Sequence, residues 1–192
     1  FEDLEKELLP KLIELCELSK HYNIQLSIDA EENYRLILSL LLLEKLSSHP
    51  NLSGWNGLGL ALQAYQKRAF YVIDWLDKLA KRDNRVINVR LVKGAYWDYE
   101  IKNAQIKGHA GYPVFTNKQL TDLSFLVSAN TLINSPNLEG CFATHNAHSI
   151  AAIMSLVNEK GNKVVEKYNS TAGRFILSSV LPKNHKIKFS LI

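Results

Sequence analysis

The stretch Val89-Arg90-Leu91-Val92-Lys93-Gly94-Ala95-Tyr96-Trp97 combines an apolar run, one arginine and a glycine turn that ends in two aromatic residues. Side chains along a strand alternate between its two faces. Residues 86–92 are therefore predicted to form a strand whose odd-numbered residues share an apolar face, while Arg90 lies on the opposite face. A guanidinium keeps its proton, so in such a run it needs an anionic or hydrogen-bond-accepting partner. Arg90 belongs either to an internal ion pair with Asp29 or to a functional site.

Three other short runs have the same division into an apolar face and a small or polar face. These predicted strands cover residues 24–29, 58–64 and 140–145. Amphipathic stretches of helix length cover residues 31–47, 67–82, 98–107, 117–133 and 147–159. A helix over residues 4–21 precedes them, and Pro10 predicts a kink or a division in it. Alternating strands and helices indicate a parallel α/β sheet.

The polar faces of the predicted strands favour a barrel over an open sheet. An open sheet with helices on both sides needs apolar residues on both faces. Barrel enzymes place their chemistry at the carboxyl ends of successive strands. The polar groups at these ends are Asp29, Gln63, Arg90 and Thr144-His145-Asn146. The predicted fold class is therefore α/β, as part of a (β/α)8 TIM-like barrel.

The formal net charge of +4 is concentrated near the C-terminus. Residues 159–192 carry seven Lys or Arg and two Asp or Glu, whereas residues 1–158 are nearly neutral. We therefore divide the chain into a partial barrel domain, residues 1–158, and a basic tail of unassigned structure, residues 159–192. The charge of the tail leaves nucleic acid open as a partner of that segment.

Cysteine content and hydropathy indicate a cytoplasmic protein. Two cysteines, Cys16 and Cys141, do not suggest a disulfide framework. The apolar stretch between Arg35 and Lys45 is far shorter than the ~20 residues that span a membrane. The N-terminus lacks a signal-peptide pattern. We expect a cytoplasmic location and no membrane-spanning segment.

Several candidate residues also have an ordinary structural interpretation. Asp29 precedes two glutamates and would cap the following helix, and Asn146 is a suitable helix N-cap. Tyr96 and Trp97 either offer flat surfaces to a ring-bearing ligand or pack at the barrel rim. Gly94 permits either a close approach of the backbone to a ligand or an unusual turn.

Metal and nicotinamide sites are not expected. His145 and His148 are separated by two residues without a third ligand nearby, whereas metal sites need three or four ligands at defined spacing. The glycine-rich fingerprints of dinucleotide and phosphate-binding loops do not occur in the sequence.

Four motifs together resemble the proline dehydrogenase part of the bifunctional proline utilization A family. In chain order they are residues 27–32, 63–68, 89–98 and 143–148, and the similarity extends to about Leu156. The resemblance implies a distorted (β/α)8 barrel, of which this chain holds about strands 2 to 5. The barrel is thus expected to be incomplete within the chain.

The resemblance also implies a reaction and its partners. These are the FAD-dependent oxidation of L-proline to Δ1-pyrroline-5-carboxylate, electron transfer to a membrane quinone, and peripheral membrane association of the full-length protein. Nucleic-acid binding in this family belongs to a separate module, so none is expected here. The alternative is a catalytically incomplete fragment with at most partial flavin binding, whose two unpaired strand edges favour homo-oligomers.

The resemblance assigns roles to individual residues. The expected flavin contacts are Gln63, Arg90, Val92, Gly94, Trp97, Thr116, Thr144, His145 and Asn146. The expected catalytic residues are Arg90, together with Asp29 and Tyr96 around the proline. A fixed cation such as Arg90 would stabilise the negative charge that hydride transfer leaves on the flavin.

Overall fold

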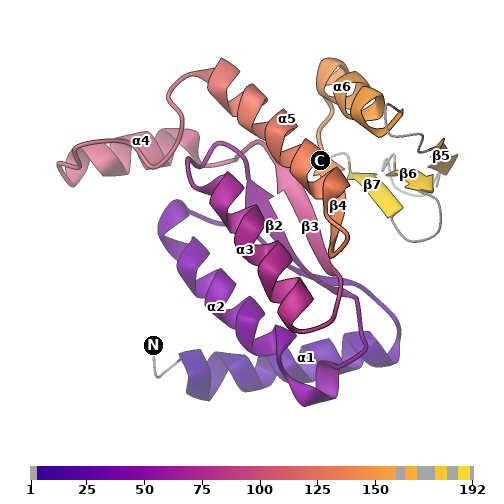
Figure 1. Ribbon diagram of the computed structural model, residues 1–192. Helices are drawn as coiled ribbons and strands as arrows, with labels where there is room; N and C mark the ends of the chain where they lie inside the picture. The colour runs from indigo at the N-terminus through magenta and orange to yellow at the C-terminus, as the bar shows by residue number, and fades with distance from the viewer. Residues whose placement is uncertain (1–3, 159–162, 168–175, 181–185, 191–192) are drawn as a thin grey trace.

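A computed structural model describes residues 4–158, 163–167, 176–180 and 186–190, in an α/β arrangement (Figure 1). Its first four strands are β1 (Leu26–Ile28), β2 (Leu58–Gln63), β3 (Ile87–Val92) and β4 (Leu138–Ala143). The helices are α1 (Leu9–His21), α2 (Leu36–Ser47), α3 (Ala69–Arg82), α4 (Trp97–Ile106), α5 (Lys118–Asn134) and α6 (Ala147–Asn158). The predicted alternation of strands and helices is confirmed.

The strands β1 to β4 lie side by side in chain order, and each pairs in parallel with the next. The register places Leu60 opposite Val89, and Val89 opposite Gly140. Because the strands are parallel, their carboxyl ends meet at one edge of the sheet. This edge is where the sequence predicts the site.

The sheet continues beyond β4 with segments for which the sequence predicted no structure. β7 (Lys186–Ser190) pairs in parallel with β4, and β6 (Ile176–Val180) and β5 (Lys163–Lys167) follow in antiparallel order. The expectation of two unpaired strand edges is therefore wrong at β4, because the backbone of β7 supplies its hydrogen-bonding partners. At the other end of the sheet, β1 is the terminal strand.

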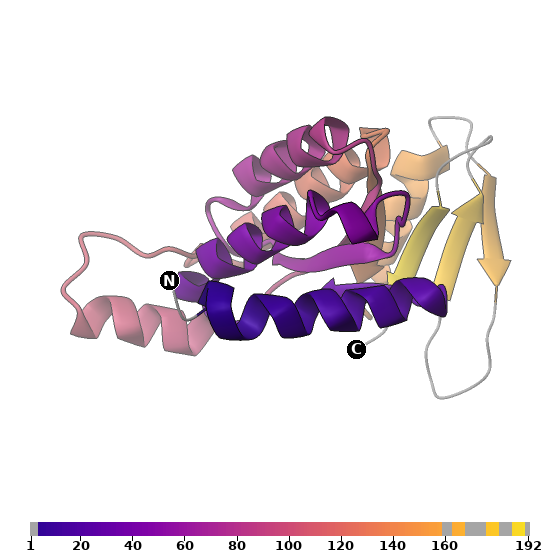
Figure 2. The ribbon, with the colours of Figure 1, turned by 90° about the horizontal axis from the view of Figure 1, so that it is seen from below.

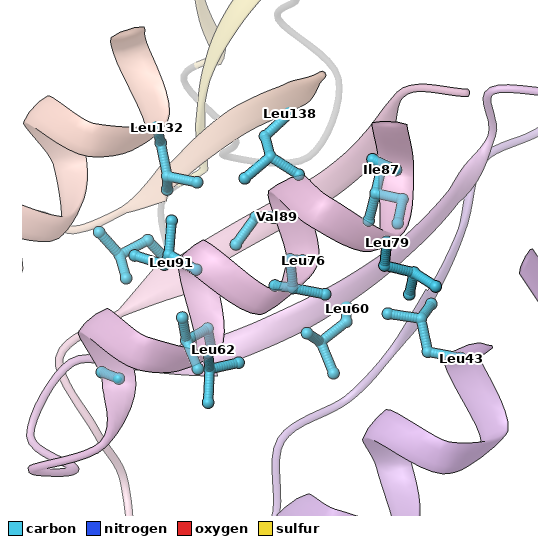
Figure 3. Packing of buried hydrophobic residues seen from close by; sticks show 14 of the residues in the cluster. Leu43, Leu60, Leu62, Leu76, Leu79, Ile87, Val89, Leu91, Leu132 and Leu138 are labelled. Atoms are coloured by element: carbon cyan, nitrogen blue, oxygen red, sulfur yellow. The ribbon is translucent and has the colours of Figure 1, made fainter. Parts of the chain in front are cut away.

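Helices α2, α3 and α5 cover one face of the sheet (Figures 1 and 2). Side chains of β2, β3 and β4 interleave there with those of the helices (Figure 3). The core residues at the centre of this layer include Leu60, Leu62, Ile73, Leu76, Ile87, Val89, Leu91 and Leu132, all at most 2% exposed. Burying one such side chain contributes about 1.5–3 kcal/mol to folding. The predicted apolar face is confirmed.

The opposite face of the sheet has the polar character that the sequence predicted. Gly59, Ala61 and Gln63 of β2 are small or polar and buried, whereas Asn88 and Arg90 of β3 are half-buried. Gly59 lies so close to β3 that a Cβ atom there would come within 2.6 Å of the Asn88 carbonyl oxygen. Asn88 therefore occupies the space next to Gly59, which leaves no room for a side chain there.

Helix α1 is anchored at one side of this layer. Pro10 is its second residue, after a π-helical turn, η1 (Leu4–Leu8), which confirms the predicted division. Cys16 is fully buried, and Lys20 donates hydrogen bonds to the carbonyl oxygens of Asn51 and Ser53 at 2.8 and 3.0 Å. Both bonds join α1 to the turn around η3 (Pro50–Leu52).

Several predicted boundaries differ from the structure, and those of α2 and β4 differ most. Helix α2 begins at Leu36 after a short 3-10 turn, η2 (Asn33–Arg35), whereas the sequence predicted a start at residue 31. Strand β4 covers 138–143 and not 140–145, because its pairing begins with Ile87 opposite Leu138.

Helix α4 projects away from the sheet (Figures 1 and 2). In the described part of the chain, no helix is long and apolar enough to cross a membrane.

Candidate active site

The polar groups predicted at the strand ends lie along one edge of the sheet. Asp29 follows β1, Gln63 ends β2, Arg90 lies near the end of β3, and Thr144 follows β4. Val92 sits opposite Gln63 in the register of β2 and β3. The site is therefore built from loops that the sheet holds in a fixed order.

Arg90 forms an ion pair with Asp29, in which Nη2 donates to Oδ1. The two side chains are 37% and 71% exposed, so the pair is open to ligands and is not internal. The Nε atom of Arg90 is buried and has no hydrogen-bond partner in the described part of the chain. A buried donor without an acceptor is costly. The guanidinium can thus donate one further hydrogen bond, from Nε.

One interpretation of the sequence was that Asp29 caps the following helix, but it does not. Its Oδ1 accepts a hydrogen bond from the backbone N–H of Ala30 at 2.9 Å, and α2 begins seven residues after Asp29. The carboxylate therefore binds the backbone next to it and the Arg90 guanidinium. Of the two interpretations, the ion pair is the one that the structure contains.

Gln63 joins the loops that follow β1 and β3. Its side chain is 2% exposed. Its Nε2 donates to the Glu31 carbonyl oxygen at 2.7 Å, and its Oε1 accepts from the Ala95 N–H at 3.0 Å. The amide thus fixes the backbone on both sides of the Arg90–Asp29 pair.

Tyr96 lies over the same loop. Its hydroxyl donates to Glu31 Oε2 at 3.0 Å. This hydrogen bond, more than any other contact, raises the pKa of Tyr96 above its ordinary value. The phenol is therefore a neutral donor at physiological pH, and Glu31 fixes its direction.

A cavity of about 440 Å³ lies beside these groups and contains three of the predicted flavin contacts, Gly94, Trp97 and Thr116. The segment that carries Thr116 is held to the end of β2, because the Phe115 N–H donates to the Tyr65 carbonyl oxygen at 2.8 Å. Trp97 Nε1 donates to the Phe115 carbonyl oxygen at 2.9 Å. The cavity walls are thus cross-linked by backbone and indole hydrogen bonds.

Gly94 is required by its conformation and its neighbours. Its φ of 144° lies in a region that other residues rarely adopt. A Cβ atom here would come within 2.5 Å of the Tyr65 ring. The unusual turn is therefore present, and it places the Gly94 backbone against the Tyr65 ring, which lines the cavity.

The rim of the cavity contains charged residues that the sequence analysis missed. Lys93 and Lys118 each contact Asp122, at 2.5 Å. The ammonium group of Lys118, followed by that of Lys93, holds the pKa of Asp122 below its ordinary value. Two cations share one anion, so this rim suits an anionic ligand group. Lys93 lies within the motif of residues 89–98, but the sequence did not indicate that it contacts Asp122 of α5.

Thr144, His145 and Asn146 form a turn at the end of β4. Thr144 Oγ1 accepts from the Asn146 N–H at 3.1 Å, and Asn146 Oδ1 accepts from the Ser149 N–H at 2.9 Å. The predicted N-cap of α6 is confirmed. His145 and His148 are exposed. Among the described residues, no three His, Cys, Asp or Glu side chains form a group suited to a metal ion.

The fold and the site define a class of protein: a TIM-barrel-like α/β protein with its candidate ligand site at the carboxyl ends of the strands. Residues 3–170 match the family model of proline dehydrogenase, and the chain belongs to this family. It is 54% identical over 155 residues to the bifunctional protein PutA of Klebsiella aerogenes and 50% identical over 153 residues to that of Rhizobium meliloti. Each match covers 80% of this chain and 12% of the relative.

A crystal structure of a mutant Bradyrhizobium japonicum proline utilization A superposes with a TM-score of 0.80 and 46% identity. The match covers 82% of this chain and 16% of that structure. The chain therefore spans only a small part of the length of its relatives.

Proposed function

We propose that this chain contributes to an FAD-dependent proline dehydrogenase, which oxidises L-proline to Δ1-pyrroline-5-carboxylate. The observation that carries the proposal is Arg90, held by Asp29 at the open edge of the sheet with its buried Nε atom still without an acceptor. A flavin ring supplies acceptor atoms of the kind that this donor lacks.

The residues around the cavity fit this cofactor. Trp97, Tyr65 and Phe115 provide flat apolar surfaces, and Lys93 and Lys118 provide positive charge for a phosphate-bearing ligand. From the family resemblance, Gln63, Val92, Gly94, Thr116 and the Thr144-His145-Asn146 turn are the further flavin contacts. Gln63 already uses both ends of its amide within the protein, so its role includes support of the neighbouring loops.

The proposed roles follow from charge and position. Bound FAD supplies the acceptor for the hydride that proline loses. Arg90 places a permanent positive charge where negative charge develops, and Asp29 keeps the guanidinium in that direction. Tyr96, fixed by Glu31, covers the proline ring and excludes water. Asp29, Arg90 and Tyr96 are thus the proposed catalytic residues.

The remaining partners belong to the longer protein. We propose a membrane quinone as the electron acceptor, a cytoplasmic location and peripheral contact with the inner membrane face. We also propose that residues 1–158 form the domain that carries the site, that residues 159–192 are an appended basic segment, and that this region binds no nucleic acid.

The test is an absorbance spectrum of the purified chain after incubation with FAD. We expect flavin bands that bleach when L-proline is added. The Arg90→Met variant should lose the bleaching, and Lys45→Met, an exposed substitution on α2, should retain it. A colourless protein that FAD does not convert contradicts the proposal for this chain.

A second candidate is an inactive fragment with partial flavin affinity, favoured by the 12% coverage of the relatives. It predicts flavin bands without bleaching, together with oligomers in light scattering. Bleaching by a monomer would exclude it.

A further inference from the structure

The backbone of Asn33 is held on both sides by side chains from distant parts of the chain. Its N–H donates to Glu100 Oε1 at 2.5 Å, and its carbonyl oxygen accepts from Arg68 Nη2. Glu100 lies in the first turn of α4 and is only 2% exposed. Burial lowers the pKa of Arg68, and the nearby Glu100 carboxylate opposes this effect. The buried Glu100 carboxylate and the half-buried Arg68 guanidinium thus both bind the backbone of Asn33.

The hydrogen bond between Asn33 and Glu100 is one of several contacts that join the loop after β1 to the loop after β3 and the start of α4. Asp29 pairs with Arg90. The Glu31 backbone is linked through Gln63 to Ala95, and the Glu31 carboxylate holds Tyr96. The pair of Asn33 with Glu100 follows at the far end. Residues 29–33 therefore lie between the sheet and the base of α4.

We propose that Glu100 and Arg68 are positioning residues that clamp Asn33 and thereby set the place of Asp29 and Glu31. The inference rests on the proposed function, since these two carboxylates direct Arg90 and Tyr96. Neither Glu100 nor Arg68 lines the cavity that we assign to the flavin. Their effect passes through the backbone of residues 29–33.

The hydroxyl of Tyr96 offers a readout of this clamp that needs no cofactor. The charges that raise the pKa of Tyr96 are those of Glu31, Glu32 and Asp29, all within the clamped segment. Glu100 is not one of these causes. A change in the pKa of Tyr96 on substitution of Glu100 therefore reports a change in the position of Tyr96 relative to this segment.

The experiment uses the full chain labelled with 13C at the tyrosine rings. Tyr96 is assigned with Tyr96→Phe and titrated by NMR, and hydrogen exchange of the segment 29–35 is measured by mass spectrometry. For Glu100→Ala we expect a Tyr96 pKa closer to its ordinary value and about tenfold faster exchange confined to that segment. Glu100→Gln keeps an oxygen acceptor of lower strength, so its exchange should rise only about threefold.

The matched control is Asp98→Asn, an exposed carboxylate on the same helix, which should change neither readout. If Glu100→Ala does not fold, Arg68→Met opens the other side of the same clamp and carries the same expectation. An unchanged Tyr96 pKa, or unchanged exchange of 29–35, in the folded clamp variant overturns the inference. Absence of FAD binding by the wild-type chain contradicts the proposed function and leaves both of these readouts valid.

Discussion

Gly94 lines the cavity and lies directly against the Tyr65 ring. Replacing it by alanine forces a non-glycine residue into a φ of 144° and drives a Cβ atom into the buried Tyr65 ring. Strain and overpacking together should cost about 3 kcal/mol of unfolding free energy. The control is Gly108→Ala, because Gly108 has a φ of 63° and open space around it, so only about 1 kcal/mol of strain is expected. Urea unfolding of both variants measures the difference, and equal stabilities would contradict the packing argument.

Gln63 is a single side chain that supports two loops. In Gln63→Leu the Glu31 carbonyl and the Ala95 N–H lose their partner, which should cost about 1–3 kcal/mol, because both groups are partly buried. Gln119→Leu, at an exposed position of α5, should change stability by less than about 0.5 kcal/mol. Thermal unfolding distinguishes the two. If Gln63→Leu keeps full stability and loses only flavin affinity, its role is contact with the ligand alone.

At the level of elements, alternation of side chains in strands was sufficient to predict β2 and β3 to within one residue. The start of α2 was not predictable from local sequence, because side chains that are remote in sequence, those of Glu100 and Arg68, hold the backbone of Asn33 outside the helix. The register of β4 likewise depends on its neighbour. Motif residues located Asp29 and Arg90, whereas Lys118 and Asp122 required the fold, since α5 carries them to the cavity.

The contact between the loop after β3 and α5 predicts a pH dependence. The lowered pKa of Asp122 means that its ion pairs stabilise the fold above the ordinary carboxyl pKa, and that this contribution is lost as the pH falls through the lowered value. Asp122→Asn should therefore be less stable than wild type at pH 7, by about 0.5–1 kcal/mol because the pairs are partly exposed. The difference should shrink in acid, as the pH falls through the lowered pKa of Asp122. Denaturant unfolding at pH 7 and in acid checks this, and a pH-independent difference would assign the effect to packing.

Helix α1 can be followed through the thiol of Cys16. Burial raises the pKa of Cys16 from 9.0 to about 11, which reduces its thiolate about a hundredfold at pH 8. In a Cys141→Ser background, labelling by a disulfide reagent should be slower than in the unfolded chain by at least this factor. Lys20→Ala removes the donor to the η3 turn and should accelerate labelling about fivefold. Equal rates in Cys141→Ser and in its Lys20→Ala derivative would show that these two bonds do not hold α1.

At the level of the whole molecule, the candidate site and the basic segment occupy different parts of the chain. Every proposed flavin contact lies between Gln63 and Asn146, whereas the charge excess lies in residues 159–192. The sheet nevertheless connects them, because β7 pairs with β4 through three residue pairs. Sequence composition could separate the two regions, but it could not reveal a pairing that depends only on backbone groups.

A chain shortened to residues 1–158 separates these two contributions. Because no proposed flavin contact is removed, its FAD affinity should stay within about threefold of that of the full chain. The unpaired backbone of β4 should increase association, which light scattering at several protein concentrations measures. Loss of both the flavin bands and the helical circular dichroism would show that residues 159–192 belong to the folded domain, and the proposed boundary at residue 158 would then be wrong.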